Sequence, residues 1–124
     1  MQKEIKTMTI NDVEYVKKSD LKEKAGTKDG LEYCIIRTYS AGVFAAYYDR
    51  KTKGMEGTIY DARRLYYWDG ACSLSQVAND GVKNPENCKF SQVVIEQDLK
   101  QIIEVLPCTE ASKQCIEEVE IWEK

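Results

Sequence analysis

Residues 62–76 hold the side chains best suited to binding a planar, charged ligand. The stretch contains Arg63 and Arg64, three consecutive aromatic residues at 66–68 and a helix-start signal at Ser73. A guanidinium is a rigid fork of N–H donors that matches phosphate and carboxylate oxygens, and a flat ring stacks on a base. The same residue types also build an ordinary β-rich core with a charged rim. The sequence leaves both interpretations open.

The arginines and aromatic residues are concentrated in the centre of the chain. All four arginines lie between positions 37 and 64, whereas the fourteen lysines are spread from end to end. Nine of the twelve aromatic residues lie between positions 33 and 68. We therefore expect any binding site to be built from this central part.

Each arginine also has a simpler interpretation. Arg63 and Arg64 are adjacent on an expected strand, so only one of them can face inward, and either can simply be solvated at the sheet surface. Arg37 lies between Ile35 and Tyr39 on an otherwise apolar face. A guanidinium there needs a partner, which could be a carboxylate, a ligand phosphate or a neighbouring subunit.

Two further features could complete a pocket. The helix start at Ser73 and Ser75 presents free backbone amides and two hydroxyls, which can receive an anion. The loop at 83–89 offers amide and ammonium donors, but it is equally typical of a plain connector. The rings at 66–68 are more typical of a core or an interface than of a stacking platform. The candidate ligand-binding residues are Arg37, Tyr39, Arg63, Arg64, Tyr66, Trp68, Ser73, Ser75, Asn84 and Lys89.

Catalytic, metal and cofactor chemistry is poorly represented. The chain has no histidine, so it lacks the usual general base near neutral pH and any Cys-His or Ser-His pair. Its five cysteines contain no Cys-x-x-Cys pair, and its seven glycines are too scattered for a nucleotide-binding loop. We expect a protein that is not an enzyme and holds no metal or cofactor.

Charge and composition narrow the partners and the location. The net charge is −3, and residues 91–124 carry three lysines against eight acidic residues. No segment has the basic excess of a duplex nucleic-acid binder. No apolar run is long enough to span a membrane and the first residues do not resemble a signal peptide, so we expect a cytosolic protein whose thiols are reduced and mostly buried.

The elements that must position these residues can be placed along the chain. Residues 1–30 are expected to form an N-terminal arm, with two short strand pieces in 9–16 and a flexible connector over 17–30. Residues 31–124 are expected to form one α+β domain. Its first strand region, 33–48, alternates two faces and is interrupted at Ala41-Gly42, where we expect a bulge or a close backbone approach.

The rest of the domain follows from turn and capping signals. A hairpin loop at 49–54 leads to a returning strand at 55–60, and residues 65–68 continue extended. Ser73 and Gln76 form a capping box for a short helix that ends at Gly81. After the loop at 82–89, residues 90–95 are expected to be a strand.

Four apolar residues in 99–106 have helical spacing, although 102–106 could also be a strand. Thr109-Glu110 starts a second capped helix, and residues 119–122 are expected to be a final edge strand. The predicted fold is therefore α+β: an antiparallel β meander with two or three short helices in a single domain.

The central motifs resemble a family of short, uncharacterised tailed-phage and prophage proteins. These motifs are RTYSAGVFA at 37–45, ARRLYYW at 62–68 and GACSLSQ at 70–76, and the match continues through 83–90 and 104–107. Members of that family more often have Leu-Trp-Tyr-Trp where this chain has Leu-Tyr-Tyr-Trp at 65–68. The resemblance covers roughly residues 31–124 and the segment at 9–16.

The resemblance implies a phage accessory protein that acts in the host cytoplasm. Small phage proteins of this kind often block host defence, and one class looks like oligomeric sponges that hold cyclic nucleotides or cyclic ADP-ribose without catalysis. The arginines and rings suit such a ligand. The alternatives are an inhibitor or adaptor that binds a host protein, and a structural part of the virion. The ligand, the host target and the oligomer symmetry are not defined by the sequence.

Overall fold

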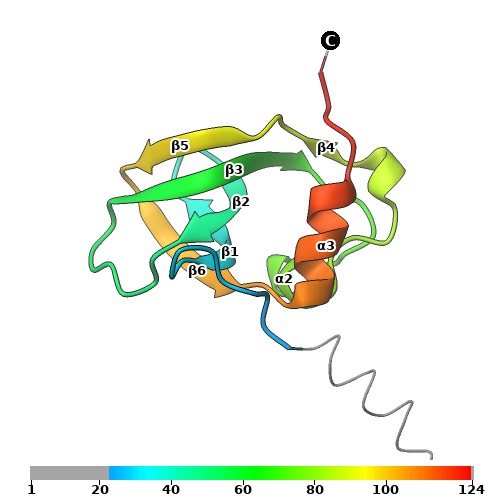
Figure 1. Ribbon diagram of the computed structural model, residues 1–124. Coiled ribbons are helices and arrows are strands. Elements are labelled where there is room, and N and C mark those ends of the chain that lie inside the picture. Colours follow the sequence, from blue (N-terminus) through cyan, green and yellow to red (C-terminus); the bar gives the residue numbers. More distant parts are fainter. Residues whose placement is uncertain (1–22, 124) are drawn as a thin grey trace, which may run out of the picture.

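The computed structural model describes residues 23–123, and the strand pieces expected at 9–16 lie outside this range. The α+β prediction is confirmed: an antiparallel sheet is combined with two short α-helices in one domain (Figure 1). The elements in chain order are β1 (Glu32–Thr38), β2 (Val43–Tyr48), β3 (Gly57–Tyr67), α2 (Leu74–Asp80), the 3-10 helix η1 (Pro85–Asn87), β4 (Lys89–Phe90), β5 (Val94–Leu99), β6 (Ile102–Pro107) and α3 (Glu110–Glu118).

The sheet is a meander whose two ends curl toward each other. Strands β1, β2 and β3 pair in sequence order, and β6 returns to pair with β1. The long strand β3 pairs with β5 along its first half and with β4 at its end. Because β5 and β6 are joined by a tight turn, the curl brings the two sides of the sheet together there (Figure 1).

The interruption at Ala41-Gly42, expected to be a bulge or a close backbone approach, is the turn between β1 and β2. Both the backbone N–H and the hydroxyl of Thr38 donate to the carbonyl of Gly42, at 3.0 and 2.7 Å. Gly42 has φ 103°, a left-handed conformation that favours glycine. The chain therefore reverses here and β2 pairs antiparallel with β1.

Both faces of the curled sheet are buried, which produces two cores. The outer core lies between the sheet and the helices and includes Tyr33 and Ile35. The inner core lies inside the curl and includes Cys34 and Ile36. The alternation expected in β1 is thus confirmed, and each fully buried isoleucine contributes roughly 1.5–3 kcal/mol of hydrophobic stabilisation.

An irregularity in β3 sets the direction of the central arginines. The register against β2 shifts between Ala45 and Tyr47, and Asp61 has φ 50°. One extra residue at this point moves the side chains that follow to the opposite face. As a result Ile59 and Ala62, three positions apart, both lie in the inner core.

The first helix begins and ends as expected. The Ser73 hydroxyl accepts from the Gln76 N–H at 3.2 Å, and the Gln76 side chain accepts from the N–H of Cys72 at 2.9 Å. Gly81 ends α2 with φ 79°. A Cβ at this glycine would lie 2.7 Å from that of Cys115 on α3, so the helices touch where the glycine is.

Three predictions in the C-terminal half need correction. The helical alternative for 99–106 is wrong, because these residues end β5 and form β6; apolar residues on a curled sheet can mimic helical spacing. The strand expected at 90–95 is broken at 91–93 between β4 and β5. The expected edge strand at 119–122 is a single bridge, between Ile121 and Phe90.

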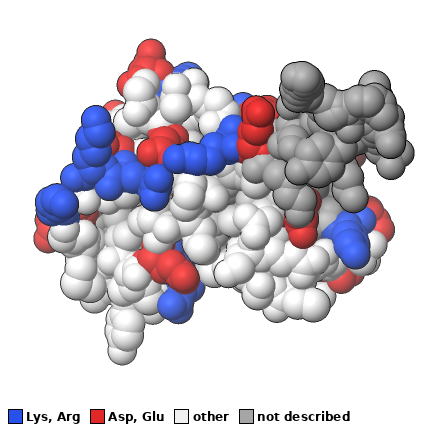
Figure 2. Space-filling model, turned by 90° about the horizontal axis from the view of Figure 1, so that it is seen from below, with Lys and Arg blue, Asp and Glu red and all other residues white. Residues whose placement is uncertain are grey.

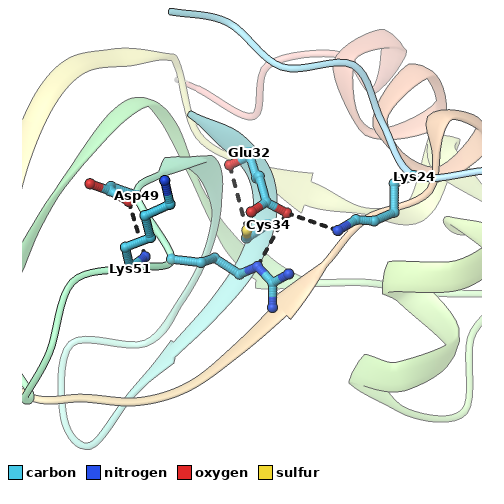
Figure 3. Close-up of polar contacts among 6 residues, drawn as sticks. Lys24, Glu32, Cys34, Asp49 and Lys51 are labelled. Carbon is cyan, nitrogen blue, oxygen red and sulfur yellow. Dashed lines mark hydrogen bonds and ion pairs between the residues drawn. The ribbon is translucent and has the colours of Figure 1, made fainter. Parts of the chain in front are cut away.

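The end of the expected connector lies against the domain. Ala25 donates its N–H to the carbonyl of Cys108, and the side chain of Glu110 accepts from the N–H of Gly26. Figure 3 shows Lys24 reaching Glu32 at the start of β1, and a second cation, Arg50, reaches the same carboxylate at 3.2 Å. These contacts hold residues 24–26 beside β1 and α3.

Charges of both signs are mixed on the surface. Seen from below, Lys and Arg side chains form a band across one side of the molecule, with Asp and Glu among them (Figure 2). Exposed ion pairs of this kind contribute about 0–1 kcal/mol each. Within residues 23–123, no helix has the length and apolar character needed to cross a membrane.

Candidate functional site

The two adjacent arginines of β3 lie on opposite faces of the sheet. Arg63 faces the outer core and is only 4% exposed, whereas Arg64 lies over the inner-core ring of Phe44. As expected for adjacent residues on a strand, the two side chains lie on opposite faces, and only that of Arg63 lies toward the helices. They cannot act as one clamp, so each must be considered separately.

Arg63 ties β3 to the end of α3. Its Nε donates to the carbonyl of Ser91 at 2.8 Å, and its Nη1 donates to the carbonyl of Ile116 at 2.7 Å. The last turn of a helix has free carbonyls and partial negative charge, so a cation is stabilised there. Burial lowers the pKa of Arg63, while Tyr33 nearby acts in the opposite direction. Much of its donor capacity is thus used inside the protein.

Arg64 leaves its guanidinium available. Its Nε is buried without a hydrogen-bond partner, and no hydrogen bond or ion pair within residues 23–123 involves its two terminal nitrogens. The guanidinium lies 4.8 Å from the ring centre of Phe44 and 6.0 Å from that of Tyr66. Both rings attract the cation, and none of its donors has an acceptor in the described part of the chain.

A cleft of about 340 Å³ is lined by Arg64, which is the one charged residue in its wall among residues 23–123. We call this hollow the Arg64 cleft. Its walls come from β2, both halves of β3, the 91–93 segment and β5. The lining residues are Phe44, Ala62, Arg64, Tyr66, Ser91, Gln92, Val94 and Gln97.

The polar groups of the Arg64 cleft divide into used and available ones. The Ser91 hydroxyl accepts from the backbone N–H of Arg64 and donates to the carbonyl of Gln92, both at 2.8 Å, so this hydroxyl already has both of its partners. The side-chain amides of Gln92 and Gln97 form no hydrogen bond within the described part of the chain. The cleft can therefore offer a guanidinium fork, two amides and an aromatic ring to a ligand.

A row of rings and cations continues from the cleft along the surface. Tyr66 packs edge-on against Trp122, with ring centres 5.4 Å apart. The Nζ of Lys89 lies over the ring of the same tryptophan, at 5.4 Å from the ring centre. The candidates Arg64, Tyr66 and Lys89 thus lie along one surface, linked by Trp122.

The predicted residues on β1 do not reach this site. Arg37 is exposed and its Nε donates to Glu104 of β6 at 2.9 Å, so its partner is a carboxylate of the neighbouring strand. The prediction that Arg37 lies on an apolar face is wrong. On that face of β1, Ile35 is buried and Arg37, two residues further on, is exposed. Tyr39 is 76% exposed in the turn that follows and lines none of the four clefts described among residues 23–123.

The candidates after β3 are also separate from the Arg64 cleft. Trp68 packs against the outer core. Ser73 uses its hydroxyl as the helix cap, and Ser75 is exposed on the first turn of α2. Asn84 precedes η1 and donates its N–H to the carbonyl of Asp69 at 3.3 Å. The start of α2, expected to form part of the pocket, therefore does not line the Arg64 cleft.

The thiols form no reactive or metal-binding cluster among the described residues. Most of the thiols are buried, as expected, namely those of Cys34, Cys88 and Cys108, and none of the five cysteines forms a disulfide within residues 23–123. Burial raises the pKa of Cys34 and of Cys108 to about 12. Thiols with such values are almost entirely protonated at neutral pH and are poor nucleophiles.

The residues that sequence reasoning missed are those brought in by strand pairing. Phe44 is the direct cross-strand partner of Arg64, and Gln92 and Gln97 come from beyond β4. Trp122 reaches the site from the C-terminal end through its N–H bond to the carbonyl of Phe90. No local spacing marks these residues, because their contacts cross 20 or more positions.

Comparison with known proteins identifies one family and no characterised relative. A family described as a domain of unknown function, DUF6948, matches residues 31–116. No curated protein and no solved structure matches the chain. The matched range includes β1 to β6 and most of α3.

Proposed function

The chain belongs to the DUF6948 family, and we propose that it is a phage accessory protein that binds a small nucleotide-derived anion in the Arg64 cleft without catalysis. The observation that carries the proposal is the guanidinium of Arg64, which has no acceptor within residues 23–123. It lies 4.8 and 6.0 Å from two ring centres, and the wall of its cleft contains no carboxylate. Sequestering a host immune signal is the role that fits such a binder.

The chemistry of the cleft favours a phosphate joined to a base. The Arg64 fork suits two phosphate oxygens, because such charge-assisted bonds are shorter and stronger than neutral ones. The ring of Tyr66 offers a stacking surface, and the amides of Gln92 and Gln97 both donate and accept, as the edge of a base requires. One cation with no opposing carboxylate leaves the site attractive to an anion.

The size of the cleft limits the ligand. Small-molecule sites usually enclose about 300–1,000 Å³. At about 340 Å³ the Arg64 cleft lies near the lower end of that range, so it favours a single nucleotide unit. Self-association and a location in the host cytoplasm stay predictions from the sequence.

The test is a panel of cyclic AMP, cyclic GMP, AMP and cyclic ADP-ribose, measured by thermal shift and then by retention through gel filtration. A bound ligand should be released unchanged on heating. Arg64→Gln should weaken binding at least tenfold, because bonds to a charged group contribute about 1.5–3 kcal/mol and 1.4 kcal/mol is tenfold in Kd.

Arg37→Gln is the matched control, since it removes an equally charged but exposed and ion-paired arginine. It should leave binding unchanged. Equal loss in both variants, or no binding by any member of the panel, would contradict the proposal.

Exposed apolar residues on β5 favour a second candidate, an inhibitor or adaptor that binds a host protein. Ile95 is 78% exposed and the adjacent Val93 and Val94 are about half exposed, which is unusual for an edge strand. If no nucleotide binds and a pull-down recovers one host protein in stoichiometric amount, this candidate is favoured. Ile95→Lys should then abolish the recovery.

A further inference from the structure

A second cavity lies on the opposite face of β3 from the Arg64 cleft. Its volume is about 530 Å³, and it is walled by the outer-core tyrosines Tyr33 and Tyr47, by Arg63 and by the segment that follows α3. It shares no lining residue with the Arg64 cleft. A ligand here would therefore contact a different set of residues from the ligand proposed above.

Arg63 is a buried cation with one guanidinium nitrogen that has no hydrogen-bond partner within residues 23–123. The side chain is 4% exposed, and its Nη2 is buried with no hydrogen-bond partner, although Nε and Nη1 are both satisfied. No carboxylate within residues 23–123 forms an ion pair with it. A buried charge without an anionic partner is costly, so an anionic group in the adjoining cavity would stabilise it.

One side of the cavity is apolar. Val93, Val119 and Ile121 line the side nearest the end of α3. Tyr33 and Tyr47 meet edge-on with ring centres 5.1 Å apart, and burial raises the pKa of Tyr33 well above its ordinary value. Tyr33 is therefore a neutral hydroxyl that can donate a hydrogen bond to an anion.

The carboxylates in the wall limit the charge of the ligand. Asp61 is bound to Lys28 at 2.6 Å, and Glu117 lies 3.7 Å from Lys113, so each has a cation beside it. Even so, two carboxylates close to one cavity disfavour a doubly charged phosphate more than a single carboxylate. This is the main chemical difference from the Arg64 cleft, whose wall contains no carboxylate.

We propose that this cavity binds a monocarboxylate with an apolar body. The carboxylate lies against the free donor of Arg63 and the hydroxyl of Tyr33, and the body packs against Val93, Val119 and Ile121. A site of this kind completes the hydrogen bonds of the most buried arginine in the described chain.

The four arginines make a direct test feasible. The side-chain Nε–H groups of Arg37, Arg50, Arg63 and Arg64 give at most four signals in a ¹⁵N–¹H spectrum, which arginine-to-lysine variants assign. The Arg63 signal should be protected from exchange, because its Nε–H is buried and bonded to Ser91. The probe is 3-phenylpropionate, titrated to about 10 mM, which is tenfold above the roughly 1 mM dissociation constant expected of a small fragment.

The expected result is a saturable shift of the Arg63 signal with 3-phenylpropionate. The neutral amide of the same acid and inorganic phosphate should not shift this signal. Val93→Glu adds a third carboxylate at the exposed edge of the cavity and leaves the hydrogen bonds of Arg63 in place. It should raise the dissociation constant obtained from the shift at least tenfold. Arg64→Gln should leave it unchanged.

Three outcomes would overturn the proposal. The Arg63 signal could stay in place throughout, it could respond equally to the amide, or the carboxylate could shift Arg64 instead. An unchanged unfolding midpoint in Val93→Glu shows that lost binding is not lost folding, and Tyr33→Phe, which removes only the hydroxyl, should weaken the same response.

Discussion

At the scale of single residues, Arg63 and Arg64 show how position changes the role of one side chain. The guanidinium of Arg63 donates to two backbone carbonyls, whereas that of Arg64 has no acceptor within residues 23–123. The difference follows from the pleat of β3, which directs one toward α3 and the other toward Phe44. A substitution of Arg63 is therefore expected to cost stability, and one of Arg64 to cost binding.

Burial also separates the cysteines, and this gives a residue-scale prediction. With iodoacetamide at pH 8, Cys72 should react first because it is exposed, and Cys34 and Cys108 should react only when the protein unfolds. The reason is that burial raises the pKa of both buried thiols to about 12, so little thiolate forms. Mass spectrometry of the labelled peptides measures the order.

Cys72→Ser is the control for this order. It should remove the fast phase and leave the slow labelling of the other thiols unchanged. Rapid labelling of Cys34 or Cys108 in the folded protein would show that the inner or outer core opens far more readily than its packing indicates.

At the scale of elements, hydroxyl groups at the start of α3 join this helix to the end of α2 through hydrogen bonds. Ser112 donates to the carbonyl of Val77 at 2.6 Å, and Thr109 donates to the carbonyl of Asn79 at 2.7 Å. These carbonyls belong to the last turn of α2, where intrahelical partners run out. The Thr109 hydroxyl thus supplies a donor to a carbonyl at the helix end, whereas Ser112 adds a second donor to the carbonyl of Val77, which already accepts the N–H of Gly81 at 2.9 Å. Gly81 lets the helices approach.

Gly81→Ala should strongly destabilise the protein. The left-handed φ of 79° costs about 1–2 kcal/mol for a residue with a Cβ, and that Cβ would lie 2.7 Å from that of Cys115. We expect a loss of more than about 2 kcal/mol in the free energy of unfolding, measured by urea titration.

Gly26→Ala is the matched control, because a Cβ added at Gly26 would have no atom within 4 Å and the φ of this residue is not left-handed. Its effect should stay within about 0.5 kcal/mol. A similar small effect at Gly81 would mean that α3 can move away from α2 at little cost.

At the scale of the whole molecule, strands β1, β2 and β3 separate the outer core from the inner core and contribute side chains to each. Ile35 packs toward the helices and Ile36, its neighbour on β1, packs inside the curl. If β1 detached from the sheet, apolar side chains of both cores would be exposed to water. We therefore expect the outer and inner cores to unfold together.

Ile35→Ala and Ile36→Ala should each destabilise the protein by about 2–5 kcal/mol and leave a single unfolding transition. Circular dichroism and tryptophan fluorescence should give the same midpoint, since Trp68 packs on the outer core and Trp122 lies beside Tyr66. Two separate transitions in either variant would show that one core can unfold alone.

Local patterns were sufficient for most of the elements and for the fold class. Alternation placed β1 and β2, and capping residues placed α2 and α3, because these signals act over a few neighbouring positions. Adjacency on a strand was also enough to separate Arg63 from Arg64. The sequence pattern did not distinguish helix from strand at 99–106, because the apolar residues of β5 and β6 in the curled sheet happen to have helical spacing.

Only the tertiary structure decided which side chains meet. Arg64, Phe44 and Gln97 are joined by strand pairing, and Ser73 and Asn84 are left elsewhere, although they are much closer to Arg64 in sequence than Gln97 is. The same holds for the cavity beside Arg63, whose walls come from β1, β2, β3 and the end of α3. The physical reason is that a pocket depends on register, on the irregularity at Asp61 and on helix packing, and these are properties of the whole folded chain.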